Sequence, residues 1–317
     1  MRTPVVSTSA VAPGKVILLG EHSVVYGRPA LAAAIDRHVE VCVAPHSTFD
    51  SSLWRSAGLL PSPLVRYASD RLGISDWRLA VRATGNLPIG VGLGSSAALS
   101  VSLVRALAAS ADVPLDAATT CQHAYGLERL FHGHPSGVDN TVATYGGLLR
   151  FTRGAPLHRV VTAPLPLVVA IGRAPRATRR AVTALRSRWE ADATSYEAIF
   201  DRIAALVADA EAAIVDADLR TLGAAMTANH ELLRRCGVST DELDAMVALA
   251  RAHRAYGAKL TGGGGGGAII GLCPEQRERC VAAFQRAGWE AFATDIVSEG
   301  GADGTRIDEI ERAVARA

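Results

Sequence analysis

The stretch NLPIGVGLGSSAALSVSLVRAL, residues 86–107, places three glycines at alternate positions directly before a run of helical periodicity. Gly90, Gly92 and Gly94 have no Cβ atoms, so the backbone N–H groups of this loop can approach a ligand closely. Leucines at four-residue spacing follow, as is typical of a helix, and the N-terminal end of a helix attracts anions. The stretch therefore predicts an anion-binding loop, with phosphate as the usual occupant.

Two serines stand where this helix should begin. One hydroxyl is enough to cap a helix, so we expect Ser95 to be the cap and Ser96 to be available to a metal ion or a phosphate. The loop matches neither of two common phosphate fingerprints. The residue three after Gly92 is a serine rather than a glycine, and no Lys-Ser or Lys-Thr pair follows the last glycine. The loop alone therefore does not identify its ligand.

Composition limits the class of protein. The 317 residues suggest about two domains. The net charge of +2, from 33 basic and 31 acidic residues, predicts no nucleic-acid partner. No apolar run reaches the ~20 residues of a membrane span, and the first residues lack the pattern of a signal peptide. We therefore expect a cytoplasmic protein without a membrane partner. Five cysteines without a C-x-x-C pair predict neither a disulfide framework nor a zinc site.

Short runs typical of strands and of helices both occur along the chain. VAPGKVILLG (11–20) and PLPLVVAIG (164–172) are typical of strands. Long alanine-rich helices follow residue 155, so we place a domain boundary there. Residues 1–155 form an N-terminal domain with the phosphate loop, and residues 156–317 form a C-terminal domain with a second glycine-rich segment. One of the later helices, STDELDAMVALARAH, begins with the spacing of a capping box.

The segment LERLFHGHPSGVDNT, residues 127–141, combines two carboxylates with a turn. Glu128 ends a predicted helix, and Asp139 follows the Pro-Ser-Gly turn. Asp139 is either a helix-start residue stabilised by the helix dipole or a carboxylate that faces a cleft. His132 and His134 flank the turn, and we interpret them as exposed or structural, because zinc sites need a larger and tighter ligand set.

Three further segments carry unusual residues. Six consecutive glycines lie between strand-like runs in KLTGGGGGGAII (259–270), although a plain hairpin needs only two loop residues; we expect their backbone to lie against a ligand. Lys15 interrupts an apolar run in APGKVILLGEHSVVYGRPALA, so it either snorkels or pairs with a negative group. The basic stretch 173–188 is either a solvated helix face or a rim that attracts an acidic small molecule.

Three of these segments, PGKVILLGEHSVVYG, PIGVGLGSSAA and KLTGGGGGGA, resemble in this order the three motifs of the galactokinase, homoserine kinase, mevalonate kinase and phosphomevalonate kinase (GHMP kinase) superfamily. GEHSVVYG, ERLFHGHPSGVDNTVATYGG and PRATRRAVTALRSR are most similar to the mevalonate kinases. A galactokinase would show Asp-Tyr where Ser23-Val24 stands. The resemblance covers most of the chain and is weakest over residues 190–250.

The resemblance implies a fold and a set of roles. The fold is α/β (α+β) and GHMP-kinase-like, with an N-terminal mixed sheet and left-handed β-α-β crossover and a C-terminal ferredoxin-like domain. ATP and substrate are expected in the cleft between the two domains. Asp139 is the expected catalytic base, with Lys15 beside it, and Ser96 and Glu128 are the expected Mg²⁺ ligands. The residues expected to bind ATP phosphates are Pro88, Gly90, Gly92, Leu93, Gly94, Ser95 and Ser96. The residues expected on the substrate side are Glu21, His22, Thr178, Gly263 and Gly264.

Three positions depart from the family pattern. Gly263 stands where the third motif usually has alanine, and Ala268 stands where a cysteine is common. Ala177 replaces the usual asparagine before Thr178. None of these changes removes a charged catalytic group, but we expect the change at Ala177 to affect either substrate contacts or regulation.

The activity that the resemblance implies is phosphorylation of the 5-hydroxyl of (R)-mevalonate by ATP, in isoprenoid biosynthesis, with ATP and Mg²⁺ as cofactors and mevalonate as the small-molecule partner. Lys15 would lower the pKa of the alcohol, and Asp139 would accept its proton. The alternatives are a phosphomevalonate kinase, a mevalonate 3-kinase, or a non-catalytic sensor of ATP or a metabolite. A sensor has no need of Lys15, Glu128 and Asp139. A monomer and a homodimer both stay open, as does feedback inhibition by prenyl diphosphates.

Overall fold

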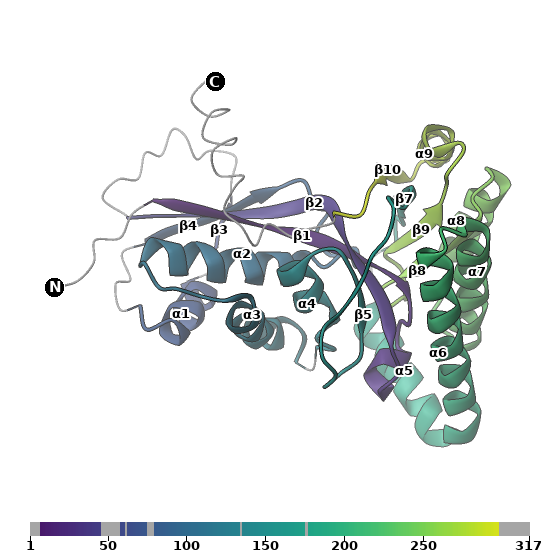
Figure 1. The fold of residues 1–317 in the computed structure, drawn as a ribbon, viewed down its shortest axis with the longest axis horizontal. Helices are drawn as coiled ribbons and strands as arrows, with labels where there is room; N and C mark the ends of the chain where they lie inside the picture. Colours follow the sequence, from purple (N-terminus) through teal and green to yellow (C-terminus); the bar gives the residue numbers. More distant parts are fainter. Residues whose placement is uncertain are drawn as a thin grey trace.

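The computed structural model describes residues 7–45, 58–60, 62–74, 79–133, 135–174 and 177–297. Two β-sheets, each packed against helices, lie side by side along the long axis of the molecule (Figure 1). We call them the first lobe, with strands β1–β6 and helices α1–α4, and the second lobe, with strands β7–β10 and helices α5–α9.

The first lobe is built on one long strand. β2 (Ala30–Pro45) pairs along one edge with β1 (Thr8–Leu19), and the short helix η1 (Ser23–Tyr26) joins the two strands. Along its other edge β2 pairs with two strands in succession, β5 (Leu148–Phe151) and β4 (Leu79–Gly85). The sheet is completed by β3 (Gly58–Leu59) beside β4 and β6 (His158–Val160) beside β5.

The strand pairing differs from the expected mixed sheet. Every neighbouring pair of the described strands in the first lobe is antiparallel. β4 and β5 do run parallel to each other, but sixteen-residue β2 is long enough for them to lie end to end along the same edge. The α/β class is confirmed, whereas the described strands of this sheet pair antiparallel rather than in the expected mixed arrangement. The hand of the crossover from β4 to β5 stays a prediction.

Helices form a layer on one face of the first sheet (Figure 1). α2 packs against both β1 and β2, and α3 and α4 pack against α2. The bounds of the four helices are α1 (Ser62–Arg71), α2 (Ser95–Ser110), α3 (Ala117–His132) and α4 (Val138–Tyr145). The phosphate loop predicted from sequence therefore leads into a helix that is buried along most of its length.

The second lobe has the predicted ferredoxin-like arrangement. Its strands are β7 (Leu167–Ile171), β8 (Gly257–Thr261), β9 (Ala268–Leu272) and β10 (Glu290–Thr294). They are antiparallel in the order β10-β7-β9-β8, so the first and third strands in the chain are central. Helices separate β7 from β8 and β9 from β10: α5 (Thr178–Ala191), α6 (Ala193–Val215), α7 (Leu219–Arg235), α8 (Asp241–Ala252) and α9 (Arg277–Arg286).

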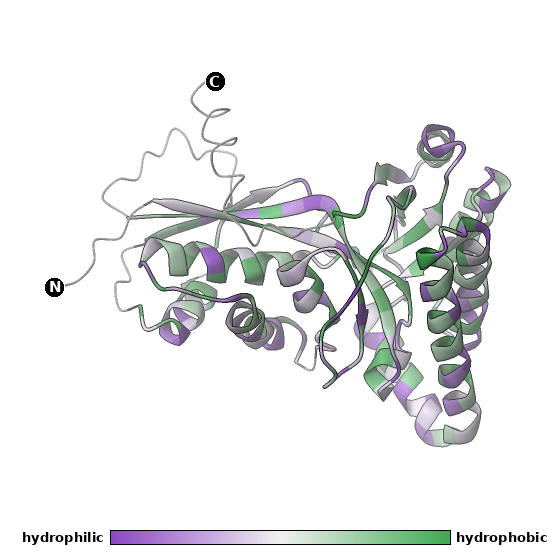
Figure 2. Ribbon diagram, in the orientation of Figure 1, coloured by the Kyte–Doolittle hydropathy of each residue, from purple (hydrophilic) through white to green (hydrophobic). Residues whose placement is uncertain are grey.

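One hydrophobic core extends through both lobes. The long helices of the second lobe carry apolar and polar stripes (Figure 2), and the apolar stripe of α7 is buried against β8. The periodicity of the sequence thus predicted these helices correctly. The sequence PEQRERCVAAFQRAG (274–288) also predicts a helix, with proline at its first position, but α9 begins three residues later, at Arg277.

Along the part that the structure describes, the chain passes between the two lobes at two places. β6 belongs to the first sheet and β7 to the second, so the chain passes from one lobe to the other between residues 160 and 167. The domain boundary at residue 155 falls just before β6 and stays a prediction. Beyond β10 the chain returns to the first lobe, where Val297 donates a backbone hydrogen bond to Ala34. Among the described residues, no helix is both long and apolar enough to cross a membrane.

Candidate active site

Lys15 and Asp139 form an ion pair at the centre of the site. The Nζ atom of Lys15 lies 3.3 Å from Oδ2 of Asp139, and the Lys15 side chain is only 3% exposed. The same Nζ donates a hydrogen bond of 3.0 Å to the carbonyl oxygen of Gly92, and the Lys15 backbone N–H donates one of 2.8 Å to Leu93. Lys15 is therefore paired rather than snorkelling, and it connects the phosphate loop to the carboxylate.

Asp139 agrees with the first interpretation of its position, that of a helix-start residue. It lies in the first turn of α4, which begins after Gly137 in a left-handed conformation with φ of +93°. A carboxylate at a helix N-terminus is stabilised by the helix dipole. Asp139 is also about one-third exposed beside Lys15, so its carboxylate is accessible, and its expected role as a catalytic base that faces a cleft stays a prediction.

The phosphate loop needs its glycines for backbone conformation and for space. Gly90, Gly92 and Gly94 have φ angles of +78°, +97° and +76°, a region that glycine favours. A Cβ atom on Gly94 would lie 2.8 Å from Cγ of Lys15. Pro88 is half-buried in the same loop. The loop thus places open backbone between Lys15 and the start of α2.

The predicted roles of the two serines are corrected in part. Gly94 takes the cap position of α2, with no side-chain cap, and the helix begins at Ser95 itself. Ser95 is therefore not the cap, because it lies one residue inside the helix; its hydroxyl accepts a hydrogen bond of 3.4 Å from the N–H of Gly90. Ser96 points to α3, where its hydroxyl donates to Oε2 of Glu128 at 3.2 Å.

Glu128 is a buried carboxylate with spare acceptor capacity. It is 1% exposed, and its Oε1 atom has no hydrogen-bond partner among the described residues. Burial, assisted by the negative charge of Asp139, raises its pKa to about 7. His132, one turn further along α3, places Nε2 3.0 Å from the Ser96 hydroxyl and 3.8 Å from Glu128. His132 is exposed as expected, but the sequence did not indicate its contact with Ser96. His134 lies outside the described residues.

Glu21 lies in the contact between the lobes, where its side chain meets residues of the second lobe. It is fully buried in an ion pair with Lys259 of β8 and accepts a hydrogen bond of 3.1 Å from Asn229 of α7. Burial outweighs the mutual attraction of the pair: it raises the pKa of Glu21 and lowers that of Lys259. The protein partners of Glu21 do not test its expected contact with substrate, which stays a prediction. The sequence did not single out Lys259 or Asn229.

His22 follows Glu21 in a strained backbone conformation. Its φ is +62°, which is uncommon for a residue with a side chain, and it is 7% exposed. Such strain is held in place by its surroundings and is frequent at functional sites. The buried pair formed by the preceding residue supplies a firm anchor for this turn.

The six-glycine run packs against the protein itself. Gly264 has a φ of +65°, and a Cβ atom there would lie 2.1 Å from the carbonyl oxygen of Val238. Thr178, the first residue of α5, donates a hydrogen bond of 3.2 Å to the carbonyl of Gly264. Close approach of protein backbone is therefore one reason for glycine here. Gly263 is not among the glycines with positive φ, so the backbone there is also suited to the alanine usual in the family.

Glu242 anchors the segment that leads to Thr178. Its carboxylate accepts hydrogen bonds from the backbone N–H groups of Arg173 and Ala174 and from the indole of Trp289. The predicted capping box is therefore wrong, because Thr240 caps α8 and Glu242 is engaged elsewhere. Burial acts to raise the pKa of Glu242, but these hydrogen bonds outweigh it and lower the pKa to about 2. Arg176, in the basic stretch, lies outside the described residues.

Replacing Glu242 with glutamine should make the protein less stable at pH 7 by about 1–3 kcal/mol, allowing for partial exposure. The carboxylate has a lowered pKa in the folded state, so its contribution is present above pH 4.5 and is lost as the pH falls towards 2. Urea unfolding at pH 7 and at pH 3 measures the difference. Glu231→Gln, at an exposed ion pair with Arg234, is the control. An equal loss in the two variants would contradict the assignment.

Two family models, and relatives and solved structures of known identity, match this chain. The model of the GHMP kinases N-terminal domain matches residues 62–147, and that of the GHMP kinases C-terminal domain matches residues 210–290. The mevalonate kinase of Pyrococcus abyssi is 32% identical, covering 95% of this chain and 98% of the relative. The mevalonate kinase of Methanothermobacter thermautotrophicus is 34% identical, covering 92% and 99%. The crystal structure of L. major mevalonate kinase in complex with R-mevalonate has a TM-score of 0.81 at 27% identity, covering 95% of this chain and all of that one.

Proposed function

Because the chain belongs to the GHMP kinase family, we propose that it transfers the γ-phosphoryl group of ATP to the 5-hydroxyl of (R)-mevalonate, giving 5-phosphomevalonate and ADP. The observation that carries the proposal is the Lys15–Asp139 pair beside the glycine loop. The names of the relatives support mevalonate as the acceptor.

The reaction needs positioning and charge stabilisation more than covalent chemistry. The open backbone between Gly90 and Gly94 and the N-terminus of α2 offer N–H groups to the phosphates of ATP. Lys15 already lies between that loop and Asp139, so an acceptor hydroxyl placed beside the pair would meet a cation and a carboxylate together. Asp139 then receives the hydroxyl proton as the oxygen attacks phosphorus.

Ser96 and Glu128 fit a magnesium ion. Both offer oxygen, the donor that Mg²⁺ prefers, and the unpartnered Oε1 of buried Glu128 is available to a ligand. The described residues contain no cluster of three or more His, Cys, Asp and Glu side chains that would hold a metal alone. Mg²⁺ is commonly bound by one or two protein groups together with substrate phosphates, where it neutralises their charge. We therefore assign Ser96 and Glu128 to the metal that accompanies ATP.

Replacing Glu128 with glutamine should weaken the metal site without abolishing the fold, because the amide fills the same space. We expect the concentration of divalent metal needed for half-maximal binding to rise by at least about tenfold. Titration with Mn²⁺ in the presence of a non-hydrolysable ATP analogue, followed by electron paramagnetic resonance, measures this directly. Glu190→Gln, on the exposed face of α5, is the control. Unchanged Mn²⁺ binding in Glu128→Gln would remove Glu128 from the metal site.

The position of the new phosphate tests the proposal against a mevalonate 3-kinase. C5 of mevalonate carries two hydrogens, whereas C3 carries none. A product phosphorylated on C5 therefore gives a ³¹P resonance split into a triplet by the neighbouring methylene, and one phosphorylated on C3 gives a singlet. We expect the triplet. A singlet would show that the chain is a mevalonate 3-kinase instead.

A further inference from the structure

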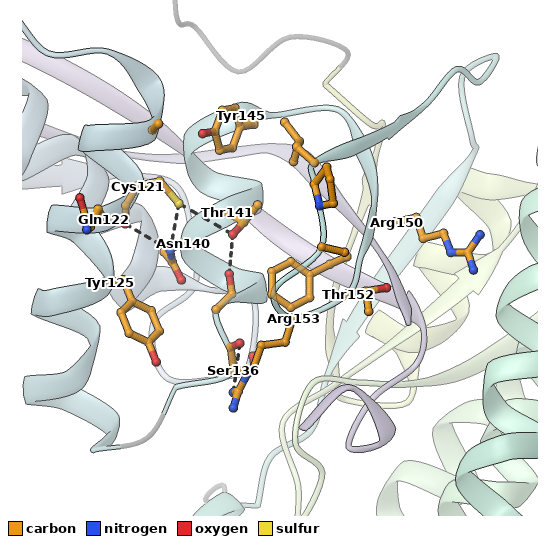
Figure 3. A pocket seen from close by; sticks show the side chains of 16 residues that line it. Cys121, Gln122, Tyr125, Ser136, Asn140, Thr141, Tyr145, Arg150, Thr152 and Arg153 are labelled. Atoms are coloured by element: carbon orange, nitrogen blue, oxygen red, sulfur yellow. Dashed lines mark hydrogen bonds between the residues drawn. The ribbon is translucent and has the colours of Figure 1, made fainter. Parts of the chain in front are cut away.

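A cavity of about 500 Å³ lies on the first lobe, apart from the groups described above. It is bounded by α3, α4, β5 and the turn between β5 and β6 (Figure 3), and we call it the α3–α4 pocket. Neither Lys15, Ser96, Glu128 nor Asp139 lines it. The pocket and the proposed active site therefore share α4 and use different faces of that helix.

The lining of the pocket is apolar with a positive rim. Tyr125, Phe151 and Leu157 contribute rings and an aliphatic chain, and none of the described lining residues is acidic. Two arginines, Arg150 and Arg153, are part of the wall. Arg150 pairs with Glu211 of α6 at 3.1 Å, whereas Arg153 donates only to backbone carbonyls and has no carboxylate partner among the described residues. The charge of Arg153 is therefore available to an anion.

An unsatisfied acceptor lies deeper in the pocket wall. Asn140 is 3% exposed, and its amide nitrogen donates to the carbonyl oxygen of Cys121 at 3.3 Å. Its Oδ1 atom is buried and has no hydrogen-bond partner among the described residues. Figure 3 shows this side chain on the pocket side of α4, between Cys121 and Tyr125. Because buried polar atoms in proteins are nearly always paired, this oxygen indicates a site for a hydrogen-bond donor.

The same wall contacts the turn that leads to Asp139. Arg153 donates to the carbonyls of Pro135 and Ser136, at 3.3 Å each. A Cβ atom on Gly137 would lie 3.3 Å from the ring of Phe151, so ring and turn are in close contact. Ser136 and Gly137 themselves line the pocket, and α4 begins at the next residue. A molecule that moves Arg153 or Phe151 therefore acts on the turn two residues before Asp139.

We propose that the α3–α4 pocket binds a small amphipathic anion, with an apolar or aromatic body, one anionic group for Arg153 and one hydrogen-bond donor for Asn140. Through the turn at Pro135–Gly137, the bound molecule changes turnover; this second part rests on the proposed kinase activity. The proposal that the pocket binds such an anion does not depend on that activity.

The probe is 8-anilino-1-naphthalenesulfonate, which has an aromatic body, a sulfonate and an N–H group and fluoresces when it leaves water. We expect it to bind the full-length chain in the presence of saturating ATP and Mg²⁺. Arg153→Ala removes the cation, and Ala118→Trp places a large side chain at an exposed position of the pocket wall. Each should raise the Kd of the probe by about tenfold or more, as for the loss of one charged hydrogen bond or of shape complementarity.

Two matched variants are the controls. Arg251→Ala makes the same charge change on exposed α8, and Ala109→Trp adds the same ring at an exposed position of α2. Both should leave the Kd within about twofold of wild type. Complete displacement of the probe by ATP, or equal Kd values in pocket and control variants, would overturn the proposed site.

The coupling is tested by steady-state kinetics with mevalonate. The probe should lower kcat in wild type with little change in the KM for ATP, and it should lose this effect in Ala118→Trp. Binding with unchanged kcat would overturn the coupling. If the chain does not phosphorylate mevalonate, the proposed function fails while the fluorescence result still decides the pocket.

Discussion

Replacing Asp139 with asparagine is expected to lower kcat by about 10²–10⁴-fold, the range for loss of a general base. The amide keeps the shape of the side chain but cannot accept the proton of the acceptor alcohol. Lys15 keeps its hydrogen bond to the carbonyl of Gly92, so the glycine loop should retain its position. We therefore expect the Kd for ATP to change by less than about threefold, since a loss confined to the chemical step leaves ground-state binding intact.

Rapid-quench measurement of a single turnover, together with a fluorescence titration of ATP, separates the chemical step from binding. Asp209→Asn, at an exposed position of α6, is the control for the same chemical change. Turnover near the wild-type value in Asp139→Asn would show that another group accepts the proton. A parallel loss of ATP binding would show that Asp139 positions the loop instead.

Replacing Lys259 with methionine is expected to destabilise the protein by about 3–5 kcal/mol, the cost of leaving a buried charge without its partner. Glu21 would then lose its cationic partner and keep the side-chain hydrogen bond from Asn229 in a fully buried environment. Lys259 also donates to the backbone carbonyls of Ile17 and Leu260, so it joins β1 of the first lobe to β8 of the second. Urea unfolding at pH 7 measures the loss.

The double variant Glu21→Gln/Lys259→Met distinguishes charge from packing. Replacing a whole buried pair by apolar residues of similar volume is often close to neutral. Glutamine is uncharged but still polar, so the double variant should recover part of the lost stability. Arg186→Met, which breaks an exposed ion pair with Glu190, should cost less than about 1 kcal/mol. If Lys259→Met costs no more than Arg186→Met, or if the double variant is less stable than the single one, the buried pair does not have the assigned role.

The sequence predicted the individual helices and strands well, but it predicted the pairing of the strands less well. The residues VDNTVATY (138–145), between a Pro-Ser-Gly turn and two glycines, predict a short helix, and α4 has these bounds. The antiparallel pairing of the first sheet depends on the length of β2, which pairs with β4 and β5 along one edge. No local pattern reports which strands share an edge. The cap of α2 was misplaced by one residue because glycine, which lacks a side-chain acceptor, takes that position.

The candidate site divides in the same way. Lys15 was conspicuous in the sequence, since a lysine within an apolar strand requires a partner, and the structure supplies Asp139 from 124 positions further along the chain. Lys259 also stands in an apolar run, yet it precedes six glycines that drew the interpretation towards a ligand. Glu242 fits the spacing of a capping box, so no sequence signal indicated its long-range contact with Arg173. When a residue already fits a local motif, its sequence pattern does not indicate the long-range contact that it makes in the fold.

The most direct test of the central claim is a comparison of phosphoryl acceptors. ADP release is measured with the full-length chain, ATP and Mg²⁺, using (R)-mevalonate, phosphomevalonate, homoserine and galactose at matched concentrations. We expect kcat/KM for (R)-mevalonate to exceed that for each of the other three by at least about a hundredfold, because an acceptor that does not fit loses interactions in the transition state. Activity confined to one of the other three acceptors, or ADP release that no acceptor stimulates, would contradict the assignment.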